Sequence, residues 1–358
     1  MTTTCKALVL TTALLVVAAP FTLTATATAE ATHPGDNGRI VFHREDETGF
    51  TQIWTANPDL SAPEQLTDSE THSGWAAWSP DGARIAFDSD RSDPDRTDSV
   101  YVNDVFTMRA DGADVQKVTD SVGFSGDPAY SPDGSMIAFA ADRGVVSGHP
   151  GWPSSLADLS IYVIRPDGTD MRRVTTPPSV SSDTEPRFSP DGSQLVFTRF
   201  RGVGSHAETE RFRGDSSALF TVNVDGTGLR RITGWGLDVG QADWSPDGRL
   251  LVFETACCRL GAGGIFTVSV NGGAVTTVVN GHGVTGIGNE QALQFDGYYD
   301  PVWSPDGTTI IAGRELLDDD GSFRVGLISL DSDGSNLDWV SPLADGEHQP
   351  DWGTSPLR

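Results

Sequence analysis

Residues 241–253 read QADWSPDGRLLVF, and this stretch decides the fold because its pattern recurs along the chain. Its centre is an aromatic residue, then Ser-Pro-Asp-Gly, then a short apolar run. The tetrapeptide occurs five times, at intervals of 52 to 59 residues: Ser79–Gly82, Ser131–Gly134, Ser189–Gly192, Ser245–Gly248 and Ser304–Gly307. A repeat of this length, made of turns and short strands, is typical of stacked or closed arrays.

The Ser-Pro-Asp-Gly tetrapeptide predicts a tight hairpin. Proline presets φ for the second position of a type I turn, while serine suits the first position and glycine the last. Glycine then adopts the left-handed conformation that begins the return strand with a bulge. An Asp-Gly or Asn-Gly turn follows each hairpin, and a short fourth strand ends in Val118-Thr119, Val174-Thr175 or Ile232-Thr233. Each repeat therefore predicts four antiparallel strands, which make one propeller blade.

The two ends of the repeat region predict how the array closes. Residues 38–68 contain the last three strands of a unit but not the first. Residues 347–352, EHQPDW, resemble a first strand such as Tyr299–Trp303. We therefore expect the C-terminal strand to complete the first blade, next to Ile40–Phe42. The predicted fold is all-β, a six-bladed β-propeller whose closure removes the open strand edges that invite aggregation.

The N-terminus has the pattern of an export signal. Lys6 supplies a positive charge, residues 7–19 form a short apolar stretch, and residues 27–29 offer a small-x-small cleavage site. An apolar stretch of this length is too short to remain as a membrane span. We divide the chain into a signal peptide (1–29), a short tail (30–37) and a propeller (38–358). The mature protein is expected to be secreted or periplasmic, without stable membrane insertion.

Charge and cysteine content narrow the classes of partner. The net charge of −26 argues against nucleic acids and anionic membranes, and divalent cations stay open as partners. Many of the aspartates lie in the repeated turns, where they bond to the backbone. Cys257 and Cys258 are adjacent, so they form either a strained vicinal disulfide or two thiols, and the sequence leaves both open.

The strand order predicts two unlike faces. Both short turns of each unit lie on one face, and the long, irregular loops lie on the other, where binding residues usually occur. We expect a monomer that binds a protein, a small molecule or a glycan on this loop face. The candidate residues on the loop face are Arg143, His149, Trp152, Arg199, His206, Gln241, Tyr299 and His348.

A ring of mostly polar residues is predicted at the channel mouth, three residues before the aromatic residue of each unit. Its members are Trp75, Asp127, Glu185, Gln241, Asp300 and Gln349. Asp127, Glu185 and Asp300 carry the oxygen ligands that a cation such as Ca²⁺ prefers. The alternative is that these carboxylates bond to backbone groups, and we favour it because no second metal signature accompanies them. Arg143 and Arg199, in the same blades as Asp127 and Glu185, are the internal candidates to offset their charge.

The whole pattern, from the aromatic-Ser-Pro-Asp-Gly turn through Asp-Gly to Val-Thr, resembles the TolB-type six-bladed β-propeller repeat over residues 38 to about 352. The resemblance implies binding of proteins or small ligands at the loop face. TolB carries an α/β domain ahead of its propeller, whereas these repeats begin almost directly after the expected signal peptide. We therefore expect a propeller without that domain.

Catalytic signatures are missing from the sequence. A Gly-x-Ser-x-Gly elbow is absent, and no acid–base pair stands out. The predicted function is accordingly a binding scaffold that uses its loop face. The alternative is a metal-dependent propeller enzyme, a hydrolase or lyase, with a cation at the channel mouth.

Overall fold

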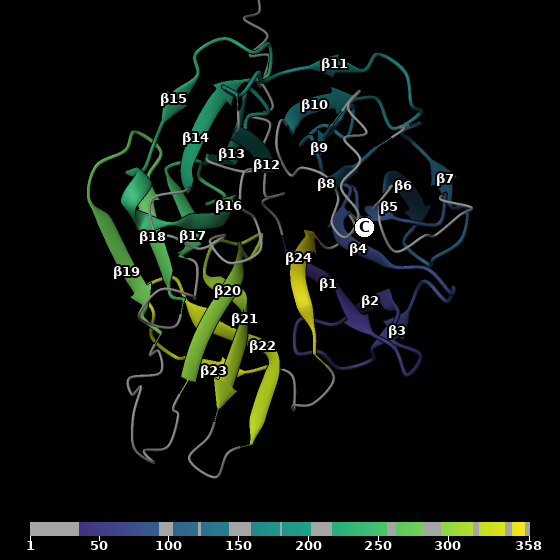
Figure 1. Cartoon of the computed structure of the whole chain (residues 1–358). Coiled ribbons are helices and arrows are strands. Elements are labelled where there is room, and N and C mark those ends of the chain that lie inside the picture. The colour runs from purple at the N-terminus through teal and green to yellow at the C-terminus, as the bar shows by residue number, and fades with distance from the viewer. Residues whose placement is uncertain are drawn as a thin grey trace, which may run out of the picture.

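A computed structural model describes residues 36–92, 103–120, 123–142, 159–179, 181–201, 217–255, 263–281, 295–317, 322–340 and 346–354. These residues form six four-stranded antiparallel sheets arranged around a central axis (Figure 1). The structure confirms the predicted six-bladed β-propeller. Within the described ranges the only helical element is a 3₁₀ turn, η1 (Trp235–Leu237), and no described helix could cross a membrane.

Each blade runs from an innermost strand beside the axis to a short outermost strand, except that the fifth blade ends in a strand of five residues. The first three blades comprise β24 (His348–Thr354), β1 (Asn37–Glu45), β2 (Thr51–Ala56) and β3 (Glu64–Gln65); β4 (Ser73–Trp78), β5 (Arg84–Ser89), β6 (Asp104–Arg109) and β7 (Gln116–Lys117); and β8 (Ser125–Tyr130), β9 (Ile137–Ala141), β10 (Ser160–Ile164) and β11 (Arg172–Arg173). The last three comprise β12 (Ser181–Phe188), β13 (Gln194–Arg201), β14 (Ser217–Asn223) and β15 (Arg230–Arg231); β16 (Val239–Trp244), β17 (Leu250–Thr255), β18 (Ile265–Ser269) and β19 (Val275–Val279); and β20 (Phe295–Trp303), β21 (Thr309–Leu317), β22 (Phe323–Asp331) and β23 (Asp338–Trp339).

The C-terminal strand closes the ring, as the sequence predicted. β24 pairs with β1, and Ile40 lies opposite Trp352 (Figure 1). Trp352 Nε1 donates a hydrogen bond of 3.2 Å to the Gly38 carbonyl oxygen. The Trp352 indole packs in a buried cluster with Ile40 and Phe42 of the first blade and Val302 of the sixth. The two ends of the described chain therefore share one sheet and also contact the neighbouring blade.

The Ser-Pro-Asp-Gly turns share one hydrogen-bond pattern. In the turn at 131–134, Ser131 Oγ donates to Asp133 Oδ1 at 2.6 Å, and the Ser135 amide donates to the same oxygen at 3.0 Å. Gly134 has the left-handed φ of 68°, and a Cβ placed on it would lie 3.4 Å from the Pro80 ring in the preceding blade. The serine–aspartate bond recurs in all five turns. Each turn therefore closes its own hairpin and, at 131–134, also contacts the blade before it.

Four outermost strands end before the Thr residues that follow them. We predicted that the strand of the second blade includes Val118-Thr119, but β7 ends at Lys117. The Thr119 hydroxyl accepts a hydrogen bond of 2.9 Å from the Val105 amide and so replaces the next rung of the ladder. Equivalent bonds of 2.9 Å reach Thr67, Thr175 and Thr233. The predicted strand end was wrong because the hydroxyl of Thr119, and not a backbone carbonyl, accepts the hydrogen bond from the neighbouring strand at this point.

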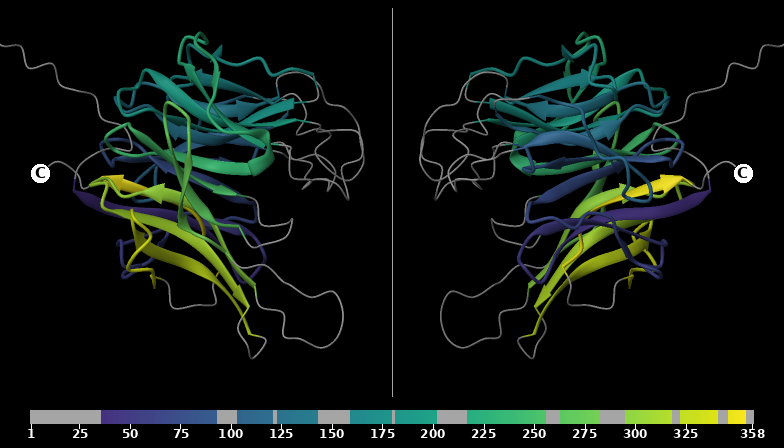
Figure 2. Two further views of the ribbon diagram at one scale, coloured as in Figure 1. Left: turned by 90° about the vertical axis from the view of Figure 1, so that its left-hand side faces the viewer. Right: turned by 90° about the vertical axis from the view of Figure 1, so that its right-hand side faces the viewer.

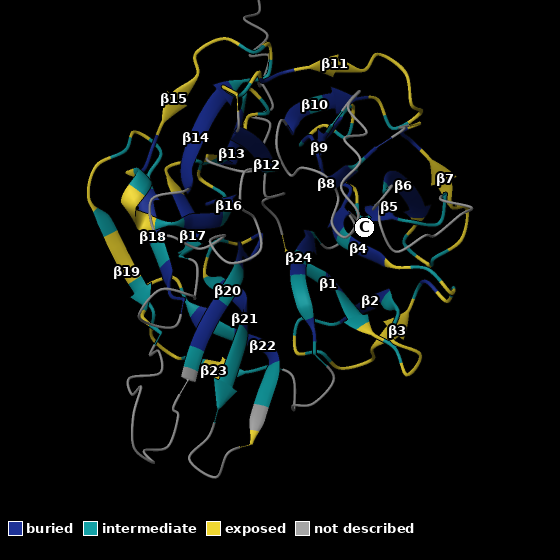
Figure 3. Ribbon diagram, in the orientation of Figure 1, coloured by how far each residue is buried: buried dark blue, intermediate teal, exposed yellow. Residues whose placement is uncertain are grey.

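The hydrophobic core lies between the blades. Phe197 and Phe220 of the fourth blade share one buried cluster with Ile161 of the third, and Val41 of the first shares another with Phe87 of the second. Buried residues concentrate in the strands near the axis, and exposed residues concentrate in the outermost strands (Figure 3). Seen edge-on, the blades stack side by side around the axis (Figure 2). This packing holds the innermost strands rigidly around the channel.

Candidate functional site

A ring of left-handed residues lies in the innermost strands. Its members are the six predicted ring residues, with φ between 47° and 56°: Trp75, Asp127, Glu185, Gln241, Asp300 and Gln349. Each lies where the register of its strand shifts, which marks a β-bulge. Bulges re-aim side chains and are common beside functional sites. Aligning the internal repeats of the sequence therefore identified equivalent positions in six blades, although it did not predict their left-handed conformation.

The ring carboxylates join neighbouring blades by accepting backbone hydrogen bonds. Asp127 Oδ2 accepts from the Glu185 amide at 3.1 Å, and Glu185 Oε2 accepts from the Gln241 amide at 2.9 Å. Two acids on second strands do the same. Asp88 Oδ2 accepts from the Asp127 amide at 3.2 Å, and Glu254 Oε2 accepts from the Asp300 amide at 2.6 Å. For Asp127 and Glu185, these contacts are of the kind expected if the ring carboxylates bond to backbone groups and not to a metal ion.

Burial and mutual repulsion raise the pKa values of these acids. Desolvation, with the charge of Glu185 adding to it, raises the pKa of Asp127 to about 7 and that of Asp300 to about 7. Burial is also the main cause that raises the pKa values of Asp88 and Glu254, with Asp127 and Asp300 as the respective charged neighbours. The described channel therefore holds more acidic groups than it can ionise without a penalty.

Arg187 supplies positive charge to the channel, although it was not among the site residues predicted from the sequence. Its guanidinium lowers the pKa values of Asp127, Glu185 and Asp300, against the larger effect of burial. It lies two residues after Glu185 on β12, at the position that Asp243 and Asp351 occupy in other blades. Its position two residues after a ring residue is the sequence signal from which Arg187 could have been predicted as a channel residue.

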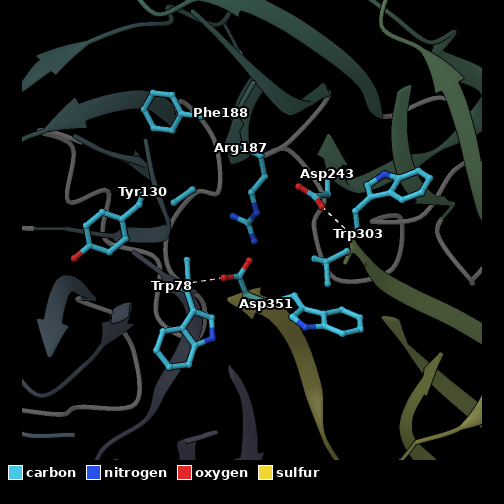
Figure 4. A pocket seen from close by; sticks show the side chains of 11 residues that line it. Trp78, Tyr130, Arg187, Phe188, Asp243, Trp303 and Asp351 are labelled. Carbon is cyan, nitrogen blue, oxygen red and sulfur yellow. Dashed lines mark hydrogen bonds between the residues drawn. The ribbon is translucent and has the colours of Figure 1, made fainter. Parts of the chain in front are cut away.

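The channel around Arg187 is narrow. Figure 4 shows the guanidinium between the carboxylates of Asp243 and Asp351, which accept hydrogen bonds from the Trp303 amide at 3.0 Å and the Trp78 amide at 2.8 Å. Arg187 lines two cavities, of about 40 Å³ and about 10 Å³. Such volumes hold a few waters or a single small group, whereas drug-sized ligands need several hundred Å³.

Arg199, a candidate for the loop face and for the charge of Glu185, faces its own blade. Its Nη2 donates to Asp183 Oδ2 at 2.8 Å, and its guanidinium lies 4.8 Å from the centroid of the Phe220 ring. The side chain is buried, and its charge is balanced by Asp183. Arg143, His149, Trp152, His206, Cys257 and Cys258 lie outside the described residues, as does the expected signal peptide.

The level beside the ring consists of six cross-strand pairs, one from each blade. They are Gly74–Asp88, Gly126–Ala140, Thr184–Thr198, Gly240–Glu254, Tyr299–Gly313 and His348–His43. In three of these pairs a larger side chain faces a glycine, and a Cβ on Gly313 would lie 2.1 Å from the Tyr299 ring. Of the remaining blades, the third contributes a glycine and an alanine, the fourth two threonines, and the first two histidines. The channel mouth is therefore asymmetric at this level, where the aromatic and imidazole side chains belong to blades one and six.

Tyr299, His348 and His43 form a column of stacked rings, which we call the rim column. The ring centroids of Tyr299 and His348 are 5.5 Å apart, and those of His348 and His43 are 5.7 Å apart. Burial, with a contribution from His348, lowers the pKa of His43 to about 3. Burial also lowers the pKa of His348 and raises that of Tyr299. All three side chains are therefore uncharged at neutral pH.

Buried polar atoms around the rim column have no hydrogen-bond partner in the part of the chain that the structure describes. They are Tyr299 Oη, Glu347 Oε2 and Gln349 Oε1, and also His43 Nδ1, which lies 3.5 Å from the Cβ position of Gly74 in the second blade. Glu347 is only 3 % exposed, and its other oxygen binds Arg44. Because buried polar atoms nearly always have a partner, each of these atoms is a place where an ordered water molecule could bind.

The candidate residues divide between these features. Tyr299 and His348 are brought together in the rim column, and Gln241 lies with Asp300 on the smaller cavity. His43 was missed, although it follows Phe42 just as Asp88 follows Phe87 and Glu254 follows Phe253. The position of His43 in the repeat could therefore be predicted from the sequence. Its contact with β24 could not.

A calcium site at Asp127, Glu185 and Asp300 stays a prediction. Within the described ranges, no three His, Cys, Asp or Glu side chains are grouped so as to hold a metal ion. One oxygen of Asp127 and one of Glu185 each accept a hydrogen bond from a backbone amide, which competes with binding of a metal ion. Calorimetry of the parent protein with added calcium would test the prediction.

Comparisons with known proteins agree with the geometry. No protein-family model matches the chain. Over 150 residues, 34 % of this chain, it is 33 % identical to the protein TolB homolog of Chlorobium luteolum, and the match spans only 32 % of that relative. The crystal structure of TolB from Acinetobacter baumannii superimposes with a TM-score of 0.62 at 20 % identity, covering 90 % of this chain and 68 % of that one. The structure of putative TolB from Agrobacterium tumefaciens gives a TM-score of 0.54 at 19 % identity, covering 88 % and 92 %. The chain is a six-bladed propeller that resembles proteins named TolB in sequence and in fold.

Proposed function

We propose that the chain is an exported binding module that holds a partner protein at the channel mouth, over the rim column. The rim column carries the proposal, because it stacks three rings across blades one and six, and Tyr299 Oη and His43 Nδ1 lack partners in the described chain. The channel cavities are too small for a drug-sized ligand. A partner that inserts side chains suits this site better than a free small molecule.

The ionisation of the site favours binding over acid–base catalysis. A general acid or base works best with a pKa near the operating pH. His43, with a pKa of about 3, stays neutral at pH 7, and so does Tyr299, whose pKa is raised. Asp127 and Asp300 have pKa values of about 7, but both are buried in the blade-to-blade hydrogen bonds.

Export and partner class are part of the proposal. The predicted signal peptide supports a secreted or periplasmic location, and the similarity to proteins named TolB supports a protein as the partner. The acidic character of the chain supports a partner with a basic contact surface.

Site-specific photo-crosslinking in the cells that make the protein tests the proposal. A photoreactive phenylalanine analogue replaces Glu45, which is exposed and lies two residues beyond His43 on β1. The matched control carries it at Ser135, which is exposed in a Ser-Pro-Asp-Gly turn on the other face. We expect one discrete protein adduct from position 45 and none from position 135. Adducts from position 135 alone, or from neither position, would contradict a partner at the mouth.

A further inference from the structure

We infer that the outer edge of the third and fourth blades is a second binding surface, which takes an acidic segment of a partner protein. The surface consists of residues 171–173 and 229–231, and we call it the arginine edge. It includes the outermost strands β11 and β15, which are exposed at the periphery, whereas the innermost strands line the channel (Figure 3). The inference therefore goes beyond the proposed function and does not depend on it.

The arginines of this edge have no carboxylate partner. β11 is Arg172–Arg173 and β15 is Arg230–Arg231, and all four residues are exposed. None of them has an ion pair among the described residues, although the chain carries 50 acidic residues against 24 basic ones. Two acids lie near enough to interact with the edge, but Asp183 is paired within its own blade and Asp225 accepts hydrogen bonds within its own turn. The positive charge of the edge therefore has no opposite charge in direct contact.

The second blade shows how this chain balances a basic residue at the same position. Lys117 occupies the position of the second arginine of β11 and β15, as the strand pairing shows. Its ammonium group binds Asp104 at 2.9 Å and Asp120 at 3.2 Å. In the third and fourth blades, Ser160 and Ala218 stand in place of Asp104, and a threonine and a glycine stand in place of the other acid. These two blades therefore carry the positive charge without either of the acids that would balance it.

Protection of the strand edge does not account for this difference. Charged side chains on outermost strands discourage pairing with another chain. Lys117 gives the second blade such a charged edge while it stays in its ion pairs. The arginine edge therefore carries more uncompensated charge than edge protection requires.

The arginines are held in place by groups that leave their charge available. The Arg231 guanidinium lies 5.8 Å from the centroid of the Trp235 ring and makes no hydrogen bond within the described ranges, so its five N–H donors remain for a partner. Arg172 and Arg230 each donate to a backbone carbonyl of the next blade. Arg173 donates to a hydroxyl and a carbonyl in its own blade. Two neighbouring blades thus present oriented guanidinium groups, which bind carboxylates through two parallel hydrogen bonds.

Exposed apolar side chains beside the arginines indicate the class of partner. Met171, which is 38 % exposed, precedes one arginine pair, and Leu229, which is 48 % exposed, precedes the other. Methionine and arginine are enriched where proteins bind one another. An anionic glycan supplies no apolar side chains, and an anionic membrane repels a chain with a net charge of −26. A protein segment with acidic and apolar side chains matches both parts of the edge.

Fluorescence anisotropy of the full-length protein with an acidic peptide tests the inference. The probe is a labelled peptide in which pairs of glutamates alternate with single leucines, and the control peptide has glutamine in place of glutamate. We expect the glutamate peptide to bind at least about tenfold more tightly, because hydrogen bonds to charged groups are worth roughly twice neutral ones. The difference should shrink in high salt, since the arginines are exposed. Equal binding of the two peptides would overturn the inference.

Two matched variants locate the binding. Arg231→Gln removes an exposed charge that has no ion pair in the described chain, so we expect an unchanged melting temperature and at least about fivefold weaker binding of the glutamate peptide. Lys117→Gln is the control, because it removes one charge at the equivalent position of the second blade, where two acids already bind it. We expect the control to bind the peptide like the parent. Parent-like binding by Arg231→Gln would place the peptide elsewhere and overturn the inference.

Vesicles of phosphatidylglycerol test the other source of anionic groups. We expect no binding to them at physiological salt. Binding that depends on Arg231, without binding of the glutamate peptide, would assign the arginine edge to a membrane and overturn the inference. Crosslinking from position 45 reports on the channel mouth and not on the outermost strands, so failure of the proposed function and failure of this inference are distinguishable.

Discussion

At the scale of single residues, the inner ring combines an unfavourable backbone conformation with buried charge. A non-glycine residue at positive φ costs on the order of 1–3 kcal/mol and persists only when its surroundings hold it. Here the holding groups are carboxylates of adjacent blades, as when Asp127 accepts from Glu185 and Glu254 accepts from Asp300. The same acids that secure the bulges therefore repel one another in the channel.

The first prediction concerns the charge of Asp127, which is surrounded by Asp88, Glu185 and Arg187. Its pKa is about 7 in the folded protein and near 3.8 ordinarily, so the folded state binds the extra proton in between. The stability that this proton contributes is complete below pH 3.8 and is lost as the pH rises through 7. Asp127→Asn keeps an acceptor oxygen and removes the charge. We compare the free energy of unfolding of the variant with that of the parent. We expect this difference to rise in favour of the variant by about 1–3 kcal/mol from pH 5 to pH 8.

Urea unfolding at both pH values measures this difference. Asp133→Asn is the control, because hydrogen bonds from Ser131 and Ser135 outweigh desolvation and lower the Asp133 pKa. Its aspartate stabilises the fold above the ordinary pKa and loses this effect as the pH falls, so the control should not gain stability at pH 8. An Asp127→Asn gain that is the same at pH 5 and pH 8 would show that charge is not the cause.

At the scale of elements, each hairpin turn serves both its own blade and the next. The glycine of a turn packs against the proline of the preceding turn in four of the five cases: Gly134 on Pro80, Gly192 on Pro132, Gly248 on Pro190 and Gly307 on Pro246. A turn whose sequence looks purely local therefore also sets the spacing between blades.

The second prediction concerns this turn. Gly134→Val places a β-branched side chain at φ 68° and a Cβ 3.4 Å from Pro80. We expect a loss of about 1–3 kcal/mol, seen as a lower melting temperature. Gly234→Ala is the control, because Gly234 has φ −72° and open space around its Cβ position, and it should melt like the parent. Equal melting of the two variants would refute our account of the turn.

At the scale of the whole molecule, stability depends on the contact between the two ends of the described chain. β24 supplies the innermost strand of the first blade, and Trp352 fills the interface to the sixth. Asp351 adds the bond to the Trp78 amide in the second blade. Loss of β24 would expose the edge of β1 and remove contacts to both neighbouring blades.

The third prediction follows from this closure. Deletion of residues 348–358 should lower the free energy of unfolding by several kcal/mol and should speed hydrogen exchange of the β1 amides. Trp352→Ala, a milder change, should cost about 3–5 kcal/mol. Deletion of residues 355–358 alone, which leaves β24 intact, is the control. A melting temperature unchanged by the longer deletion would contradict closure by β24.

The sequence by itself determined the blades, the hairpins and the positions of the inner ring. Turn chemistry acts over four residues, and the recurrence of Ser-Pro-Asp-Gly aligns Asp127 with Glu185 and Asp300 without knowledge of the fold. Only the tertiary structure decided which groups meet. Arg187 enters the channel while Arg199 turns to Asp183, and His43 stacks on His348 from the far end of the chain. Their pKa values depend on burial by neighbouring blades, which no local pattern encodes.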